Sequence, residues 1–128
     1  MTDETKKKVA ERYIEKEAKW DAFAMSNLRS RTTGIQGAVI WISTGTSSGG
    51  KKLQHGPRVK VTLGETASVS KGSASVSVGT NPRVLAGTLP AKIEKDVLAW
   101  VRLNQNALTR YWNDELETAE VLPLLHQI

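Results

Sequence analysis

The feature that most constrains the fold is a long stretch in the C-terminal part of the chain without any helix-breaking residue. After Pro90, which suits the first turn of a helix, neither Gly nor Pro occurs up to Asp114. At 100° per residue its large apolar side chains fall within an arc of about 120°. These side chains are Ile93, Val97, Trp100, Val101, Leu108, Tyr111 and Trp112. The pattern predicts one core helix over 90–114, kinked near residues 104–106.

Two details refine this prediction. Asn104 lies in the middle of the apolar arc, so we expect a buried amide that hydrogen-bonds to strand backbone or to a Trp N–H. The last residues, Glu117 to Ile128, predict a short final helix whose length Pro123 limits.

In the middle of the chain the hydrophobic period changes from that of a helix to that of a strand. From Arg58 to Leu63, Val59, Val61 and Leu63 alternate with polar side chains and are expected to point inward, which leaves a basic outer face. Ala38–Ser43 reads as a strand with both faces covered, and 67–70 with 73–78 as a hairpin. The polar stretch 26–34 is expected to end a preceding helix, and Asn81, Pro82 and Gly87 mark a loop. About four antiparallel strands are therefore expected.

The first residues predict a separate helix. Thr2 or Asp3 can cap it, and its apolar residues share one side at 100° per residue. These are Val9, Tyr13, Trp20, Phe23 and Ala24. The prediction for the whole chain is an α+β fold, with a small antiparallel sheet flanked by an N-terminal helix and C-terminal helices. We divide it into an N-terminal helical extension, 1–24, and a single α+β domain, 25–128.

Composition narrows the class of protein. The chain has no cysteine, which excludes disulfides and thiolate zinc sites. It shows neither a secretory leader nor an apolar run of about 18 residues, so we expect a cytoplasmic protein that does not enter a membrane.

Charge is distributed unevenly along the chain. From Gln36 to Lys92 there are seven Lys and Arg against one acidic residue, Glu65, which gives +6; from Ile93 to Ile128 there are three against six, which gives −3. A block of one sign attracts anions or an acidic partner. The alternative is a basic sheet face that is simply solvated.

Two polar segments are candidate anion sites. Residues 45–52 nearly spell a phosphate-binding loop, but Lys52 replaces the Ser or Thr that would hold Mg²⁺, and a strand rather than a helix follows. We interpret it as a hairpin connection. Arg29 and Arg31, with the hydroxyls of Thr32 and Thr33, suit phosphate or carboxylate. The candidate binding residues are Arg29, Arg31, Lys51, Lys52, Arg58 and Lys60.

Catalytic and metal chemistry have few residues available. His55 and His126 are the only histidines, which makes a triad or a three-histidine metal site hard to build. His55 is the one candidate for a lone acid or base, and the alternative is a turn histidine bonded to backbone. We therefore predict no metal site and no cofactor.

Several motifs resemble known proteins. The stretches 25–34, 38–43 and 55–61 are similar to small uncharacterised bacterial proteins. Gly87, Leu89, Asn104, Leu108, Trp112 and Asn113 resemble the end of the domain-of-unknown-function 4160 (DUF4160) family. Together the two resemblances span about residues 25–113. The resemblance implies a short antiparallel sheet with helices, in a family often suspected of a toxin–antitoxin role. That family usually carries histidines after the proline of its Pro-His-x-His-like strand, where this chain has Arg58 and Lys60.

These observations lead to three hypotheses. The first is a non-enzymatic binding protein that acts through its basic sheet face on nucleic acid or an acidic protein. The resemblance implies a toxin–antitoxin or phage and mobile-element anti-defence setting for it. The second is a small nuclease-like or nucleotide-acting toxin that uses His55 and Arg58. The third is a partner subunit or homodimer whose basic face is only solvated.

Overall fold

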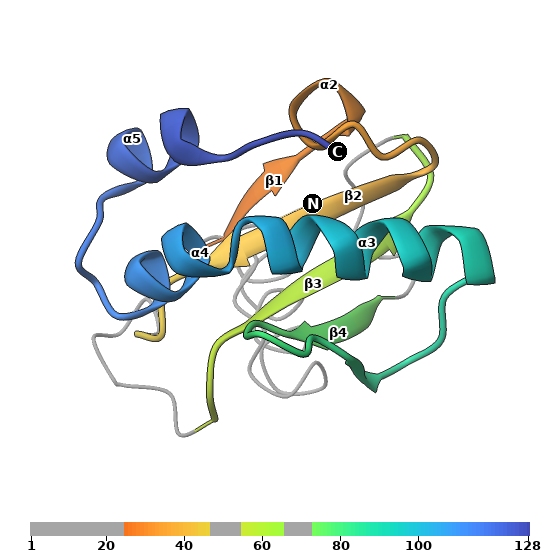
Figure 1. The fold of residues 1–128 in the computed structure, drawn as a ribbon, viewed down its shortest axis with the longest axis horizontal. Helices are drawn as coiled ribbons and strands as arrows, with labels where there is room; N and C mark the ends of the chain where they lie inside the picture. Colours follow the sequence, from red (N-terminus) through yellow and green to blue (C-terminus); the bar gives the residue numbers. More distant parts are fainter. Residues whose placement is uncertain (1–24, 47–54, 66–72) are drawn as a thin grey trace, which may run out of the picture.

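The computed structural model describes residues 25–46, 55–65 and 73–128. Three predicted features lie outside the described residues: the N-terminal helix, the loop lysines Lys51 and Lys52, and the 67–70 half of the hairpin. Within the described residues the α+β class is confirmed, because one antiparallel sheet packs against helices (Figure 1).

Among the described residues the sheet has five strands in sequence order, β1-β2-β3-β4-β5, and each strand pairs antiparallel with the next. Three of the predicted strands correspond to β2, β3 and β4, the fourth, 67–70, lies outside the described residues, and β1 and β5 were not predicted. The β2 and β3 bounds agree with the residues predicted from alternation. The strands are β1 (Met25–Leu28), β2 (Ala38–Ser43), β3 (Arg58–Leu63), β4 (Ala74–Ser77) and β5 (Val84–Ala86).

The polar stretch 26–34, which was expected only to end the preceding helix, contains part of a strand and a helical turn. Met25–Leu28 forms β1 because it pairs with β2, and it buries Leu28. A single helical turn, α2 (Ser30–Thr33), follows and ends at Gly34. Gly34 has a φ of 83°, which only glycine adopts without strain. The polar composition of this stretch did not indicate either element, because the secondary structure of such short segments is determined by pairing with the rest of the fold.

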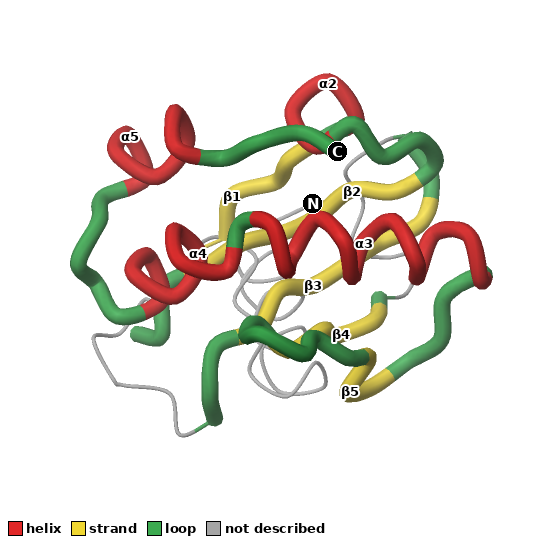
Figure 2. Tube along the Cα trace, viewed as in Figure 1, coloured by secondary structure: helices red, strands yellow, loops and turns green. Residues whose placement is uncertain are grey.

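The loop predicted at 81–87 also contains a strand, β5, at the sheet edge beside β4 (Figure 2). Ser77 and Arg83 hold the turn that leads into it: the Ser77 N–H donates to the Arg83 carbonyl at 2.9 Å, and the Arg83 N–H donates to Ser77 Oγ at 3.0 Å. A three-residue edge strand is too short to show alternation, so no sequence pattern predicted it.

The predicted 90–114 helix is two helices, α3 (Ala91–Leu103) and α4 (Gln105–Trp112), separated at Asn104. The predicted kink is therefore a break. Asn104 is buried, as expected, but its partners differ from the prediction. Its Nδ2 donates to the Trp100 carbonyl at 2.9 Å and to the His126 carbonyl at 3.0 Å, and its Oδ1 accepts the His126 N–H at 2.7 Å.

The final helix is shorter than the predicted 117–128. It comprises α5 (Thr118–Val121), begun by a capping box between Glu117 and Glu120, and a 3₁₀ turn, η3 (Leu122–Leu124), that contains Pro123. The chain then runs extended along Asn104 to α2, where the Ile128 N–H donates to the Thr33 carbonyl at 3.0 Å. Asn104 thus provides the hydrogen bonds that a neighbouring strand would give this C-terminal segment.

The main core lies between α3, α4 and one face of the sheet, which we call the near face. Val97, Trp100 and Leu108 belong to this core together with Val59 and Val61, as the helical arc and the strand alternation predict. Two details differ. Leu63 is 39% exposed at the end of β3, and Trp112 is buried outside this cluster, beside His55.

Candidate functional site

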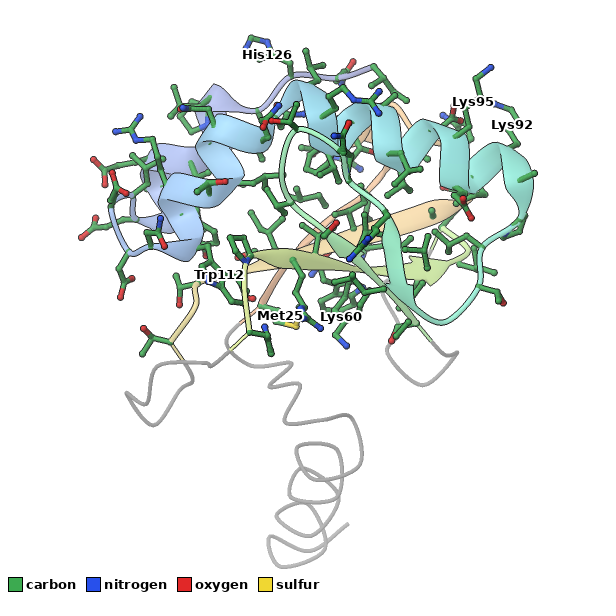
Figure 3. The ribbon with its side chains drawn as sticks, turned by 60° about the horizontal axis from the view of Figure 1, so that its bottom comes forward. Met25, Lys60, Lys92, Lys95, Trp112 and His126 are labelled. Atoms are coloured by element: carbon green, nitrogen blue, oxygen red, sulfur yellow. The ribbon has the colours of Figure 1, made fainter. Side chains whose placement is uncertain are left out.

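The strand register defines a second surface, the far face, on the side of the sheet opposite α3 and α4. Residues paired across antiparallel strands point to the same side, and neighbours along a strand alternate. Figure 3 shows Met25 and Lys60 on the side of the sheet away from α3 and α4. The described residues of the far face are Met25, Asn27, Val39, Trp41, Ser43, Arg58, Lys60, Thr62, Ser75 and Ser77.

One half of the far face is apolar. Val39 is fully buried and Trp41 is 6% exposed, and the half-buried Met25 packs against both. The Trp41 Nε1–H donates to Thr62 Oγ1 at 3.0 Å across the β2–β3 pairing. This bond explains how a sheet face can bury an indole N–H and a threonine hydroxyl, since each satisfies the other. We call Met25, Val39 and Trp41 the apolar half.

The other half is cationic. Arg58 and Lys60 are two residues apart on β3, so both point to the far face, and both are half-buried. Ser77 lies opposite Arg58, and Ser75 lies opposite Lys60. No acidic side chain belongs to the far face among the residues that the structure describes. We call Arg58, Lys60 and Ser77 the cationic half.

Arg58 also carries an unsatisfied donor. Its Nε–H is buried and has no hydrogen-bond acceptor among the described residues. The one acidic residue of the basic middle third, Glu65, is turned elsewhere: its Oε1 accepts the Gly37 N–H at 2.7 Å in an exposed turn. A buried guanidinium N–H without an acceptor costs free energy that an anionic partner would recover.

The other predicted binding residues lie apart from this half. Arg29 and Arg31 are exposed at α2, beyond the end of β1 where Leu28 pairs with Ile40. The strand register places Arg29 beside Val39 and Arg58 beside Ser43. The backbones of Arg29 and Arg58 are therefore separated by roughly 13 Å along the strands and roughly 10 Å across them. The structure thus brings together Arg58 and Lys60, but neither Arg29 nor Arg31 joins Arg58.

His55 lies at the end of the sheet near the end of α4. Its ring centroid is 5.4 Å from that of Trp112, and its Nδ1 is 3.2 Å from the Gly56 carbonyl oxygen. The Gly45 N–H donates to the Trp112 carbonyl at 2.7 Å, and a Cβ on Gly45 would stand 2.6 Å from the indole nitrogen. This contact therefore requires glycine after β2. In the described ranges no group of three His, Cys, Asp or Glu is placed to hold a metal ion.

Sequence reasoning missed part of the far face. It placed Val39 and Trp41 on one side of their strand and Arg58 and Lys60 on one side of theirs. It gave no register between the strands, so it did not place Trp41 beside Lys60 or Ser77 beside Arg58. It did not identify Met25 as part of the sheet, because no strand was predicted at β1.

Comparison with known proteins confirms the predicted resemblance to DUF4160 over residues 67–113. The model of the domain of unknown function DUF4160 matches residues 67–113, which include β4, β5, α3 and α4. Arg58 and Lys60 lie before the matched region. Searches of curated proteins and of solved structures found no match. Within the described residues no helix is long and apolar enough to cross a membrane.

Proposed function

We propose that this chain is a non-enzymatic binding protein whose cationic half engages an anionic macromolecule, with the phosphate backbone of a nucleic acid as the favoured target. The observation that carries the proposal is the placement of Arg58 and Lys60 two residues apart on the same face of β3, with Ser77 opposite Arg58.

The chemistry of the cationic half fits phosphate. Arg, Lys and Ser side chains are among the groups that contact the phosphate backbones of nucleic acids. Arg58, Lys60 and Ser77 combine these three donor types on neighbouring strands, and the Arg58 Nε–H lacks an acceptor among described residues. An acidic protein surface offers carboxylates to the same donors, so it is the second class of partner that the test separates.

The expected binding is independent of base sequence and modest in strength. Stacking on bases needs an exposed aromatic ring, and the aromatic of this face, Trp41, is 6% exposed. Two phosphate contacts give a salt slope of about −1.8, so a rise from about 50 to 200 mM salt would weaken binding about twelvefold. If Lys51, Lys52 and Arg31 also contributed, five contacts would give about 500-fold. The slope of the binding affinity against salt concentration therefore measures how many cationic side chains contact phosphate.

The biological setting is supported by resemblance alone. The setting we propose is a toxin–antitoxin or phage and mobile-element anti-defence role in the cell interior, as the resemblance to DUF4160 suggests; the matched model itself is described only as a domain of unknown function. A homodimer that presents two cationic halves would raise avidity for a polyanion.

The experiment measures binding of a fluorescent DNA duplex and of poly-glutamate to three chains. These are wild type, Arg58→Glu with Lys60→Glu, and Lys92→Glu with Lys95→Glu as the control. The control changes net charge equally, but Lys92 and Lys95 lie on the outer surface of α3 (Figure 3). We expect the first variant alone to lose duplex binding. Loss of poly-glutamate binding alone would assign an acidic protein partner, and equal binding by all chains would refute the proposal.

A further inference from the structure

The two faces of the sheet are not covered in the same way. On the near face α3 and α4 supply the apolar side chains that bury β2 and β3. On the far face Val39 is fully buried and Trp41 is 6% exposed, yet the core around them contains only Met25 besides, among described residues. Figure 3 shows α3, α4 and α5 on the other side. The burial of the apolar half therefore requires a further element that covers it.

We propose that residues 1–24 supply this element, as an amphipathic helix that docks on Met25, Val39 and Trp41. The inference does not depend on anion binding. Chain connectivity favours it, because residue 24 directly precedes Met25, whose own side chain packs on the apolar half. Any chain that leaves Met25 must start its path beside this surface.

The dimensions of the segment agree with those of the surface. Its apolar residues run from Val9 to Ala24, which is about 22 Å in a helix at 1.5 Å per residue. The six-residue strands β2 and β3 are about 20 Å long. The apolar half occupies β1 and β2, about 5 Å apart, which suits a single helix about 10 Å wide.

The composition of the segment agrees as well. Trp20, Phe23 and Tyr13 are large enough to cover an indole, and they share one side of the predicted helix with Val9. Lys16 falls within this stripe, where its alkyl stem can lie on apolar surface while its ammonium group reaches solvent. Six acidic and six basic residues give the segment no net charge, so the cationic half does not repel it.

A second copy of the chain fits less well. A stable interface between two proteins buries about 800 Å² and 20–30 residues on each partner. Three apolar side chains on two strands fall far short of this, whereas they match the contact of one helix. The occupant is therefore best sought within the same chain.

The absence of cysteine makes a direct test possible, because one introduced thiol reports on one place. Ser43→Cys puts a thiol on the far face opposite Met25, and Val97→Cys puts one in the near core as a reporter of global unfolding. In the Ser43→Cys chain, Trp20→Ser with Phe23→Ser removes apolar residues of the stripe. Lys19→Ser with Ala22→Ser is the matched control on other sides of the predicted helix.

We expect the stripe variant to raise the thiol-labelling rate at position 43 at least about tenfold, as loss of a docked element permits. The control should leave the rate within about twofold of that of the parent chain, and the thiol at position 97 should stay protected in both backgrounds. An unchanged rate in the stripe variant would overturn the proposal. A parent rate that rises on dilution would also overturn it, and would assign a second copy as the occupant. Fast labelling at position 97 would show global unfolding. The measurement would then be repeated with the milder substitutions Trp20→Tyr and Phe23→Leu.

Discussion

The two faces of this sheet bury a tryptophan in opposite ways. On the near face Trp100 is completely buried in the main core, and its Nε1–H has no acceptor among the described residues. On the far face the Trp41 Nε1–H donates to Thr62 Oγ1. The near face gains its stability from packed volume, whereas the far face combines a small apolar contact with one indole–hydroxyl hydrogen bond and two cations. A surface of the second kind suits contacts that form and release.

The largest expected effect is on the near face. Trp100→Ala should lower the free energy of unfolding by about 3–5 kcal/mol, because it leaves a large cavity at the centre of the main core. Urea denaturation measures this. A loss within about 0.5 kcal/mol, the range of surface sites, would show that α3 presents a different side to the sheet.

Replacement of each tryptophan by phenylalanine sharpens the comparison. Both variants lose a similar volume, but Trp41→Phe also leaves the buried Thr62 hydroxyl without its donor, whereas Trp100→Phe removes an N–H that lacks an acceptor among described residues. We expect Trp41→Phe to cost about 1–3 kcal/mol more than Trp100→Phe. Equal losses in parallel urea titrations would mean that the two indoles are not distinguished by hydrogen bonding.

Asn104 gives the next effect. Asn104→Leu should cost about 2–3 kcal/mol, because it removes three hydrogen bonds and leaves the His126 backbone groups without their partners. The release should be local, so proteases should trim residues 125–128 faster while the sheet stays folded. Asn104→Asp is the matched variant: it keeps the acceptor for the His126 N–H and loses both donors, so trimming should be intermediate. If residues 125–128 of Asn104→Leu resisted proteases as well as those of wild type, the side chain of Asn104 would not be what holds the C-terminal segment.

The sequence anticipated the elements that carry a strong period. Alternation from Arg58 to Leu63 and the apolar arc of 90–114 located β3, α3 and α4, since burial on one side imposes the period directly. It missed β1 and β5, whose three or four residues are held by pairing with a neighbour rather than by their own pattern. The sequence also predicted only a kink at Asn104 in one helix. The hydrogen bonds between this amide and His126 depend on a long-range contact that no local pattern indicates.

The candidate site was anticipated only within single strands. The period-2 rule paired Arg58 with Lys60, because that relation is local. The neighbours on other strands depend on register, which the turns and the buried face fix together. For this reason the positions of Ser77 and Trp41 beside Arg58 and Lys60 could be assigned only from the structure. The same holds for the separation of Arg29 and Arg31 from Arg58.

The cationic half should contribute little to stability. Arg58→Met removes a buried Nε–H that lacks an acceptor among described residues and keeps much of the apolar stem, so we expect stability to be unchanged or raised by up to about 1 kcal/mol. Duplex binding by the same variant should weaken, and its salt slope should become shallower by about 0.9. A large loss of stability together with lost binding would instead mark Arg58 as a structural residue.

The smallest effect should come from α3, on the outer surface that serves as the control for binding. Lys92 Nζ lies 3.1 Å from Asp96 Oδ2, one helical turn apart, and the lysine side chain is 85% exposed. An exposed pair of this kind contributes roughly 0.3–0.5 kcal/mol, and the position of Lys92 in the first turn opposes the helix dipole and offsets part of it. Lys92→Ala should therefore shift the unfolding free energy by less than about 0.5 kcal/mol and leave duplex binding unchanged. If Lys92→Ala weakened binding as much as Lys60→Ala, the attraction would arise from net charge over the whole molecule, and the far face would lose its distinction from the helical surface.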